Sequence, residues 1–171
     1  MEMKVYFSGT HEHVIDDGGR IAIPSSMYAT FVKHTIQPEL IYAEASKRTG
    51  IKGQVYKFVK LLRYEVLQER ANRLMSEIIS DDERDQFGEV FFSKFKPLDI
   101  KVPQPRVTLP AEWLTERKSK TASKDKAFLG NNVTFVGVGE VIEVWNTEAW
   151  KERDAERESD EASGNGSQKR V

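Results

Sequence analysis

The sequence predicts an α+β protein built from two copies of one small unit, related by a pseudo-two-fold axis. The first observation is an internal repeat: RIAIP at 20–24 returns as RVTLP at 106–110, 86 residues later. At the same offset VYKF at 55–58 falls on VIEV at 141–144. The second observation is that each copy mixes short strand-like runs with short helical runs. One such unit has a marginal core alone, so we expect two units that share a core and exchange strands.

In the first unit, turn and helix signals separate four apolar runs. Asp17-Gly18-Gly19 is a turn signal because glycine accepts positive φ, and Pro24 ends the strand that follows. Ser25 is a candidate cap for a short helix. The expected strands lie at 3–9, 21–23, 39–45 and 54–62.

The segment 65–79 has apolar residues at the three- and four-residue spacing of an amphipathic helix. Ser80 with Glu83 fits a capping box at the start of a further turn.

The second unit repeats this scheme. We expect strands at 89–95 and 106–109, a short helix after Pro110, two strands within 133–145, and a charged helix capped by Asn146 or Thr147. The predicted organisation is a first repeat at 1–86, a second at 87–157 and a disordered polar tail at 158–171.

Composition indicates a folded, soluble protein of the cytoplasm. The 171 residues are 39% hydrophobic and 10% aromatic, enough for a core. Without cysteine, disulfides, thiolate metal sites and cysteine nucleophiles are excluded. We find no signal-peptide pattern and no apolar run that could span a membrane. The net charge of −1 means that any affinity for nucleic acid must come from local positive charge.

Arg20 is the residue that the predicted fold explains least. It follows Gly18 and Gly19 at the tip of a turn, where neither a turn nor a buried strand needs an arginine. A guanidinium there is placed to bind something outside the protein. Asp16 is expected to hold the turn by accepting N–H groups.

Two segments resemble the signatures of the MraZ family, and the resemblance runs from about residue 6 to about residue 152. The first is a D-x-x-G-R turn followed by I-x-I-P, here Asp16, Gly19, Arg20, Ile21, Ile23 and Pro24. The second is an apolar strand with V-G, then I-E-V-W and a later tryptophan, here Val136, Gly137, Ile142, Glu143, Val144, Trp145 and Trp150.

The resemblance implies a tandem swapped-hairpin fold, with β-barrel units like those of AbrB and SpoVT proteins. It implies a nucleoid-associated regulator, usually a repressor, of the bacterial division and cell-wall gene cluster. Such proteins form rings and bind short G-rich direct repeats in double-stranded DNA. The implied DNA contacts are Arg20 and Arg106, with Gly19 allowing close approach and Asp16 and Gly18 shaping the turn.

The chain departs from the family pattern in its second turn and in two basic insertions. Val102 and Pro105 replace the aspartate and the glycine before Arg106. Since proline cannot adopt positive φ, that turn must have another shape. Residues 46–63 carry six cations and no acid, and residues 117–126 carry five cations against Asp125. Candidate phosphate contacts are Lys47, Arg48, Lys52, Lys118 and Lys120.

Other functions have weaker support. A structural or protein-interaction ring that has lost sequence-specific DNA binding would explain the altered second turn. An AbrB-type antitoxin is a further alternative, although those usually carry one unit per chain. His11 and His13 share a strand face, but no third metal ligand has a suitable spacing. We find no catalytic motif, and expect neither an enzyme nor a cofactor.

Overall fold

The computed structural model describes residues 4–115 and 127–168. These residues form an antiparallel six-stranded sheet, in the order β1-β7-β8-β4-β3-β5, and a separate ribbon of β2 and β6. The strands are β1 (Thr10–Val14), β2 (Arg20–Ala22), β3 (Leu40–Thr49), β4 (Val55–Leu62), β5 (Lys96–Asp99), β6 (Arg106–Thr108), β7 (Asn132–Val138) and β8 (Val141–Asn146). The helices are α1 (Ser25–Lys33), α2 (Tyr64–Met75), α3 (Asp81–Ser93), α4 (Thr147–Gln168) and the 3-10 turn η1 (Ala111–Trp113).

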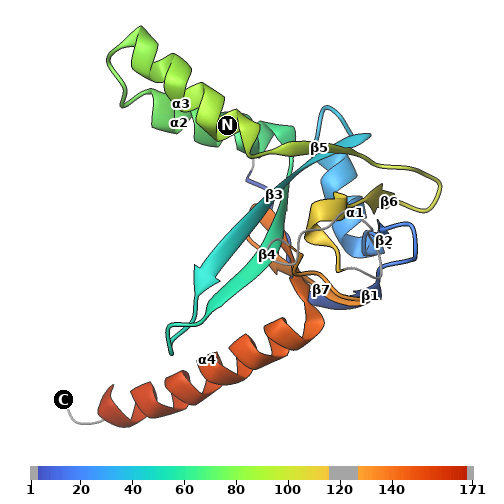
Figure 1. Cartoon of the computed structure of the whole chain (residues 1–171), viewed down its shortest axis with the longest axis vertical. Helices are drawn as coiled ribbons and strands as arrows, with labels where there is room; N and C mark the ends of the chain where they lie inside the picture. The colour runs from blue at the N-terminus through green and yellow to red at the C-terminus, as the bar shows by residue number, and fades with distance from the viewer. Residues whose placement is uncertain (1–3, 116–126, 169–171) are drawn as a thin grey trace.

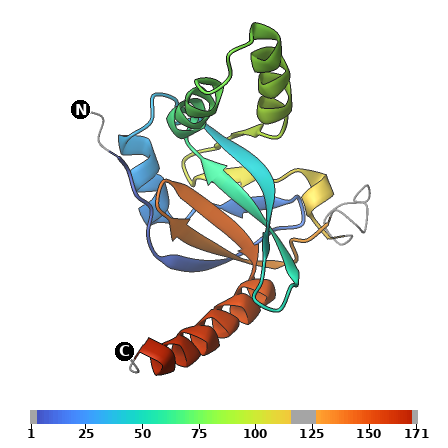
Figure 2. The ribbon, with the colours of Figure 1, turned by 90° about the vertical axis from the view of Figure 1, so that its left-hand side faces the viewer.

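The α+β class is therefore confirmed, but the sheet is not a closed barrel. Strands β1 and β5 are the edge strands of this sheet. They are not joined, because β2 and β6 pair with each other and not with them. The α2–α3 hairpin and helix α4 project from opposite ends of the sheet (Figures 1 and 2). None of the described helices has the length and apolarity to cross a membrane.

The two halves of the chain interleave in the sheet. Three pairs of strands begin 86 residues apart: β1 and β5, β2 and β6, and β4 and β8. The first strand of each half pairs with the hairpin of the other half, so β1 joins β7 and β5 joins β3. At the centre β4 pairs with β8, one strand from each half. The strand exchange expected from the repeat is present in this pairing.

The first strand starts later than the sequence predicts. We expected a strand at 3–9, but β1 is Thr10–Val14, and Phe7 makes only an isolated bridge to Gly139. The cause is Gly9, which has a φ of +90° and interrupts the extended backbone. Gly137 lets this segment cross β7, since a Cβ there would lie 2.4 Å from the backbone nitrogen of Ser8.

The predicted cap of the first helix was also wrong. Pro24 is the N-cap of α1, and no side chain caps the helix. Ser25 is the first helical residue, because Pro24 keeps an extended backbone and its carbonyl already accepts from Tyr28.

Residues 89–95, predicted as a strand, belong mostly to α3, which ends at Ser93. Phe87 and Phe91 stack with ring centroids 5.3 Å apart, and Phe91 and Phe95 contact at 5.2 Å. This four-residue spacing is helical, and it outweighs the strand preference of consecutive aromatic residues. The predicted Ser80 cap is confirmed, since its hydroxyl accepts from the Glu83 N–H at 3.4 Å.

The final helix begins at the predicted place. The Asn146 side chain accepts from the N–H groups of Glu148 and Ala149, so it caps α4. The helix then continues to Gln168, through the segment expected to be disordered from residue 158. The sequence of α4 has no proline, and the Arg157–Asp154 ion pair supports the helix just before this segment.

The main core joins both halves. It is formed by buried apolar residues from β2, α1, β6, η1 and the inner positions of the sheet. A second cluster lies where α4 meets the sheet, and Trp145 stacks on Phe58 there with centroids 4.6 Å apart.

Candidate nucleic-acid interface

The first arginine turn is held by one carboxylate. Asp16 Oδ1 accepts from the backbone N–H groups of Gly18 and Arg20, both at 2.9 Å, and Oδ2 accepts from Arg20 Nε at 2.8 Å. The backbone hydrogen bond from Arg20 is the largest effect that lowers the pKa of the Asp16 carboxyl, and the Arg20 guanidinium lowers it further. Asp16 is therefore ionised at neutral pH and fixes both the turn and the base of the arginine fork.

Gly19 makes the turn possible. Its φ is +77°, and a Cβ at this position would lie 2.7 Å from Leu114 Cδ1 in the core. Any other residue would suffer both backbone strain and a clash with a buried side chain.

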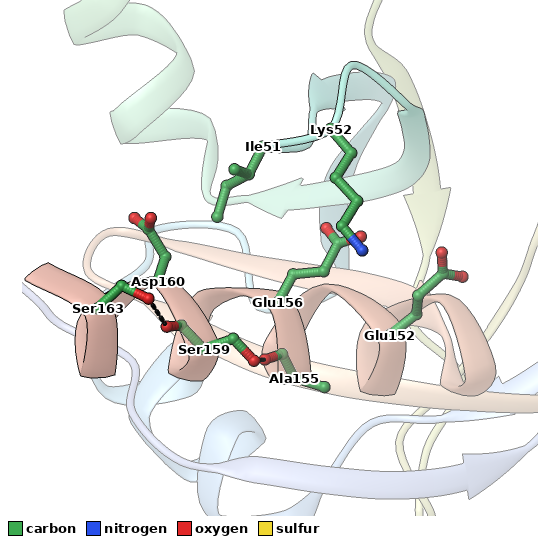
Figure 3. Close-up of a pocket in the computed structure, with 8 residues that line it drawn as sticks. All are labelled: Ile51, Lys52, Glu152, Ala155, Glu156, Ser159, Asp160 and Ser163. Atoms are coloured by element: carbon green, nitrogen blue, oxygen red, sulfur yellow. Dashed lines mark hydrogen bonds between the residues drawn. The ribbon is translucent and has the colours of Figure 1, made fainter.

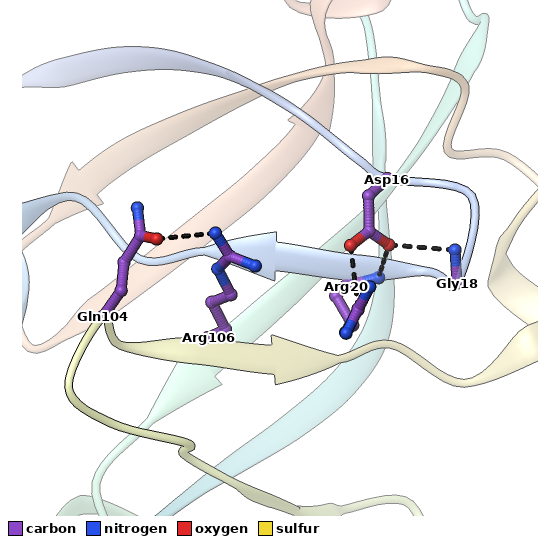
Figure 4. A network of polar contacts seen from close by, with 5 residues as sticks. All are labelled: Asp16, Gly18, Arg20, Gln104 and Arg106. Atoms are coloured by element: carbon purple, nitrogen blue, oxygen red, sulfur yellow. Dashed lines mark hydrogen bonds and ion pairs between the residues drawn. The ribbon is translucent and has the colours of Figure 1, made fainter.

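The second turn has a different construction. Lys101 and Arg106 exchange two backbone hydrogen bonds that close the loop, and Arg106 Nη2 donates to Gln104 Oε1 at 2.6 Å. Gln104 contacts Arg106 where the first turn uses Asp16 (Figure 4). The second arginine therefore has a neutral partner, and the expected different shape of this turn is confirmed.

The two turns meet in the β2–β6 ribbon. Arg20 lies opposite Thr108, Ile21 opposite Val107, and Ala22 opposite Arg106. Matching bonds flank this register: Ile23 N–H donates to the Pro105 carbonyl and Leu109 N–H to the Gly19 carbonyl.

Because side chains alternate along a strand, both arginines project from one face of the ribbon, while Ile21 and Val107 are buried on the other. Arg20 and Arg106 are diagonal neighbours there, roughly 7–8 Å apart by strand geometry.

Sequence reasoning missed Gln104 and Thr108. Thr108 is exposed and lies opposite Arg20 on the arginine face. The repeat offset makes β2 and β6 equivalent strands but leaves their register open, so the position of Thr108 opposite Arg20 became visible only in the structure. Gln104 had no signal in the sequence.

The other predicted cations lie elsewhere. The tip of the β3–β4 hairpin lies beside α4 and far from the ribbon in Figure 1. The Lys52 amine points toward the acidic side of α4, near Glu156 (Figure 3). Lys47 is exposed on β3, opposite Lys57. Lys118 and Lys120 lie outside the described residues.

Arg48 has an internal partner. Its Nη1 and Nη2 donate to the two carboxylate oxygens of Glu143, at 3.1 and 2.8 Å. Glu143 is 1% exposed and also accepts from Trp145 Nε1. The I-E-V-W segment therefore forms a buried polar network beneath α4, and the guanidinium of Arg48 is already bound within the protein.

His11 and His13 project toward β2 and α1 from β1. His11 Nε2 lies 3.5 Å from Ser26 Oγ, and His13 contacts the ring of Phe135 edge-on. Burial lowers the pKa of His13. In the part of the chain that the structure describes, no three His, Asp or Glu residues gather as metal ligands do.

Together the fold and this face define a duplicated α+β protein that presents one arginine from each half on a shared two-stranded ribbon. A comparison with models of protein families finds no match. Two curated proteins are similar over most of their length. A transcriptional regulator MraZ of Mycoplasmoides gallisepticum is 23% identical over 146 residues, 85% of each chain. A transcriptional regulator MraZ of Rhodospirillum rubrum is 27% identical over 145 residues, 84% of this chain and 81% of that protein. These similarities support the assignment of this chain to the MraZ family.

Proposed function

We propose that this chain is a DNA-binding transcriptional regulator that reads double-stranded DNA with the arginine face of its β2–β6 ribbon. The observation that carries the proposal is the position of Arg20. Its Nε is bound to Asp16, while its Nη groups have no hydrogen bond to another described residue. The outer edge of the guanidinium, formed by its two Nη groups, is thus oriented and makes no hydrogen bond within the part of the chain that the structure describes.

The outer edge of a guanidinium suits guanine, whose O6 and N7 accept two N–H groups in the major groove. A two-stranded ribbon is narrow enough to enter that groove. Gly18 and Gly19 keep the turn small beside the arginine. Arg106 sits diagonally across the ribbon, so one subunit offers two guanidinium groups to neighbouring base pairs.

The wider biology follows from the resemblance to MraZ proteins. We infer a swapped-hairpin arrangement, consistent with the exchange of β1 and β5 between the halves. The regulator would act at the nucleoid, as a repressor of the division and cell-wall gene cluster. Its subunits would form a ring on short G-rich direct repeats. A ring makes physical sense, because several weak readers on repeated sites multiply their affinity through effective concentration.

The deciding experiment measures the affinity of the full chain for a fluorescent duplex from the region upstream of its own gene, with a random duplex and a salt titration. Arg20→Ala should weaken binding to the upstream duplex by about ten- to a hundredfold, the value of one bidentate contact.

Arg157→Ala is a matched control. Arg157 pairs with Asp154 on α4, and the two side chains are 52% and 33% exposed, against 57% and 37% for Arg20 and Asp16. Equal affinity for both duplexes in the wild-type chain would contradict the proposal.

One observation favours a second candidate, a protein-interaction module. The second turn lacks the glycine of the first, and Gln104 already occupies part of the Arg106 fork. A chain that assembles but binds no duplex at moderate salt would support this alternative.

A further inference from the structure

We propose that a pocket at the start of α2 binds a small organic oxyanion, a carboxylate or a phosphate ester, through Arg63. The pocket has a volume of about 590 Å³ and lies between α2, the loop after α1, and the β7–β8 turn. Its volume is within the range of small-molecule sites.

The proposal starts from an uncompensated buried charge. Arg63 is 7% exposed, and its Nη1 donates to the His34 carbonyl at 2.5 Å. Its Nε is buried without an acceptor, and no carboxylate of the described residues forms an ion pair with it. The other buried charge in the described part of the chain, Glu143, has Arg48 as its partner. A buried guanidinium whose partner is a carbonyl is costly, and an oxyanion in the pocket that Arg63 lines would compensate its charge.

The surroundings of Arg63 also favour an anion. Arg63 precedes α2, a helix of 12 residues with no side-chain cap, so the positive end of the helix dipole lies at the pocket. Lys4 is also part of the lining. Val5 and Val66 are buried apolar residues in the lining, which suit the carbon skeleton of an organic ligand better than an inorganic ion.

Three glutamates line the same pocket, and two have partners. Glu65 accepts from the Thr35 hydroxyl and from the Ile36 N–H at 2.6 Å. Glu69 pairs with Arg73 at 3.2 Å. Glu140, in the β7–β8 turn, is half-buried and opposes an anion. Because the negative charge of Glu140 repels an anion, removing that charge should strengthen binding of the oxyanion, which gives the test a predicted direction.

The pocket is connected to the arginine turn. Arg63 holds the carbonyl of His34, the residue that ends α1, and α1 follows directly after β2. A ligand at Arg63 would therefore act on α1, the helix that follows the strand carrying Arg20. This coupling rests on the proposed DNA binding, whereas the ligand site itself does not.

The experiment follows the Arg63 Nε–H signal of the ¹⁵N-labelled full chain by NMR, without DNA. The probes are butyrate, glycerol 3-phosphate and inorganic phosphate. We expect a saturable change in the chemical shift of this signal with butyrate or glycerol 3-phosphate. The probe that binds more tightly shows whether the site prefers a carboxylate or a phosphate ester. Inorganic phosphate should bind about tenfold more weakly. No saturable shift with any probe up to about 50 mM would overturn the proposal.

Four variants define the site. Arg63→Lys should weaken binding at least about tenfold, since lysine keeps the charge but loses the fork. Because this variant has no guanidinium Nε–H, binding to it is followed at the backbone N–H signals of Glu65 and Val66, which line the pocket. Arg84→Lys, an exposed arginine of α3 that pairs with Asp81 and does not line the pocket, is the control and should change nothing.

If Arg63→Lys does not fold, Glu140→Gln should tighten binding and Lys4→Gln should weaken it; effects of the opposite sign would overturn the proposal. DNA affinity with and without the bound probe then tests the coupling separately.

Discussion

Ile21 and Val107 lie opposite each other at the centre of the β2–β6 ribbon. They are equivalent residues of the two halves, and both are 1% exposed. Their side chains fix the ribbon to the core, so the exposed arginines on its other face stand on a rigid support. Ile21→Ala should lower the free energy of unfolding by about 2–5 kcal/mol, because it leaves a cavity in the shared core.

Chemical denaturation measures this change. The control is Val55→Ala, an exposed residue of β4 at which we expect less than about 1 kcal/mol. Because the core joins both halves, Ile21→Ala should shift one cooperative transition. Separate transitions for the two halves would contradict a shared core.

Gly19 and Gly53 allow the effects of backbone strain and steric clash to be separated. Both have positive φ, +77° and +85°, but a Cβ at Gly19 would lie 2.7 Å from Leu114 Cδ1 and a Cβ at Gly53 would contact nothing within 4 Å. Gly53→Ala should therefore cost only the strain, about 1 kcal/mol. Gly19→Ala should cost about 2 kcal/mol more, since a buried leucine must move. Equal losses in thermal or chemical denaturation would show that Leu114 yields without cost.

Asp16 should make the stability of the arginine turn depend on acid pH. Hydrogen bonds from Arg20 lower its pKa in the folded chain below that of the unfolded chain, about 3.9. A lowered carboxyl pKa adds stability that is present above the unfolded pKa and is lost as the pH falls through the folded one. Asp16→Asn should therefore destabilise the protein at pH 7 and have less effect below about pH 3.

Denaturation from pH 7 down to about pH 2.5 measures this difference. Asp154→Asn removes the carboxylate of another exposed arginine pair and controls for the loss of one charge. On the proposed function, Asp16→Asn should also weaken binding to the upstream duplex, because Arg20 loses the partner that orients its fork. Unchanged affinity would mean that the turn alone positions Arg20.

The repeat made much of this fold predictable from sequence. The offset of 86 relates Arg20 to Arg106, which begin β2 and β6. It also relates Val55 to Val141, which begin β4 and β8. The errors in the predicted secondary structure arose where a local residue pattern fits both a strand and a helix. Consecutive aromatics at 91 and 92 suit a strand, but Phe87 and Phe91 stack on each other at the four-residue spacing of a helix.

The Arg48–Glu143 contact could not be predicted either. It joins residues 95 positions apart, from strands β3 and β8 that do not pair with each other. Residues 46–63 look like a basic loop by charge alone, and only the register of the sheet shows that one of the cations is bound within the protein.

This buried pair provides the last prediction. Arg48 binds both oxygens of Glu143, and its guanidinium also lies 4.8 Å from the Phe58 ring. Among the described residues, Arg48→Met leaves the buried Glu143 carboxylate with the Trp145 N–H as its one hydrogen-bond donor, so it should destabilise the chain by about 3–5 kcal/mol. Glu143→Gln removes that charge, so the double variant should be more stable than Arg48→Met alone. A double-mutant cycle by chemical denaturation measures the coupling. Additive effects of the two changes on the free energy of unfolding would mean that water compensates the charge of Glu143. The I-E-V-W segment would then be stabilised by packing and not by this ion pair.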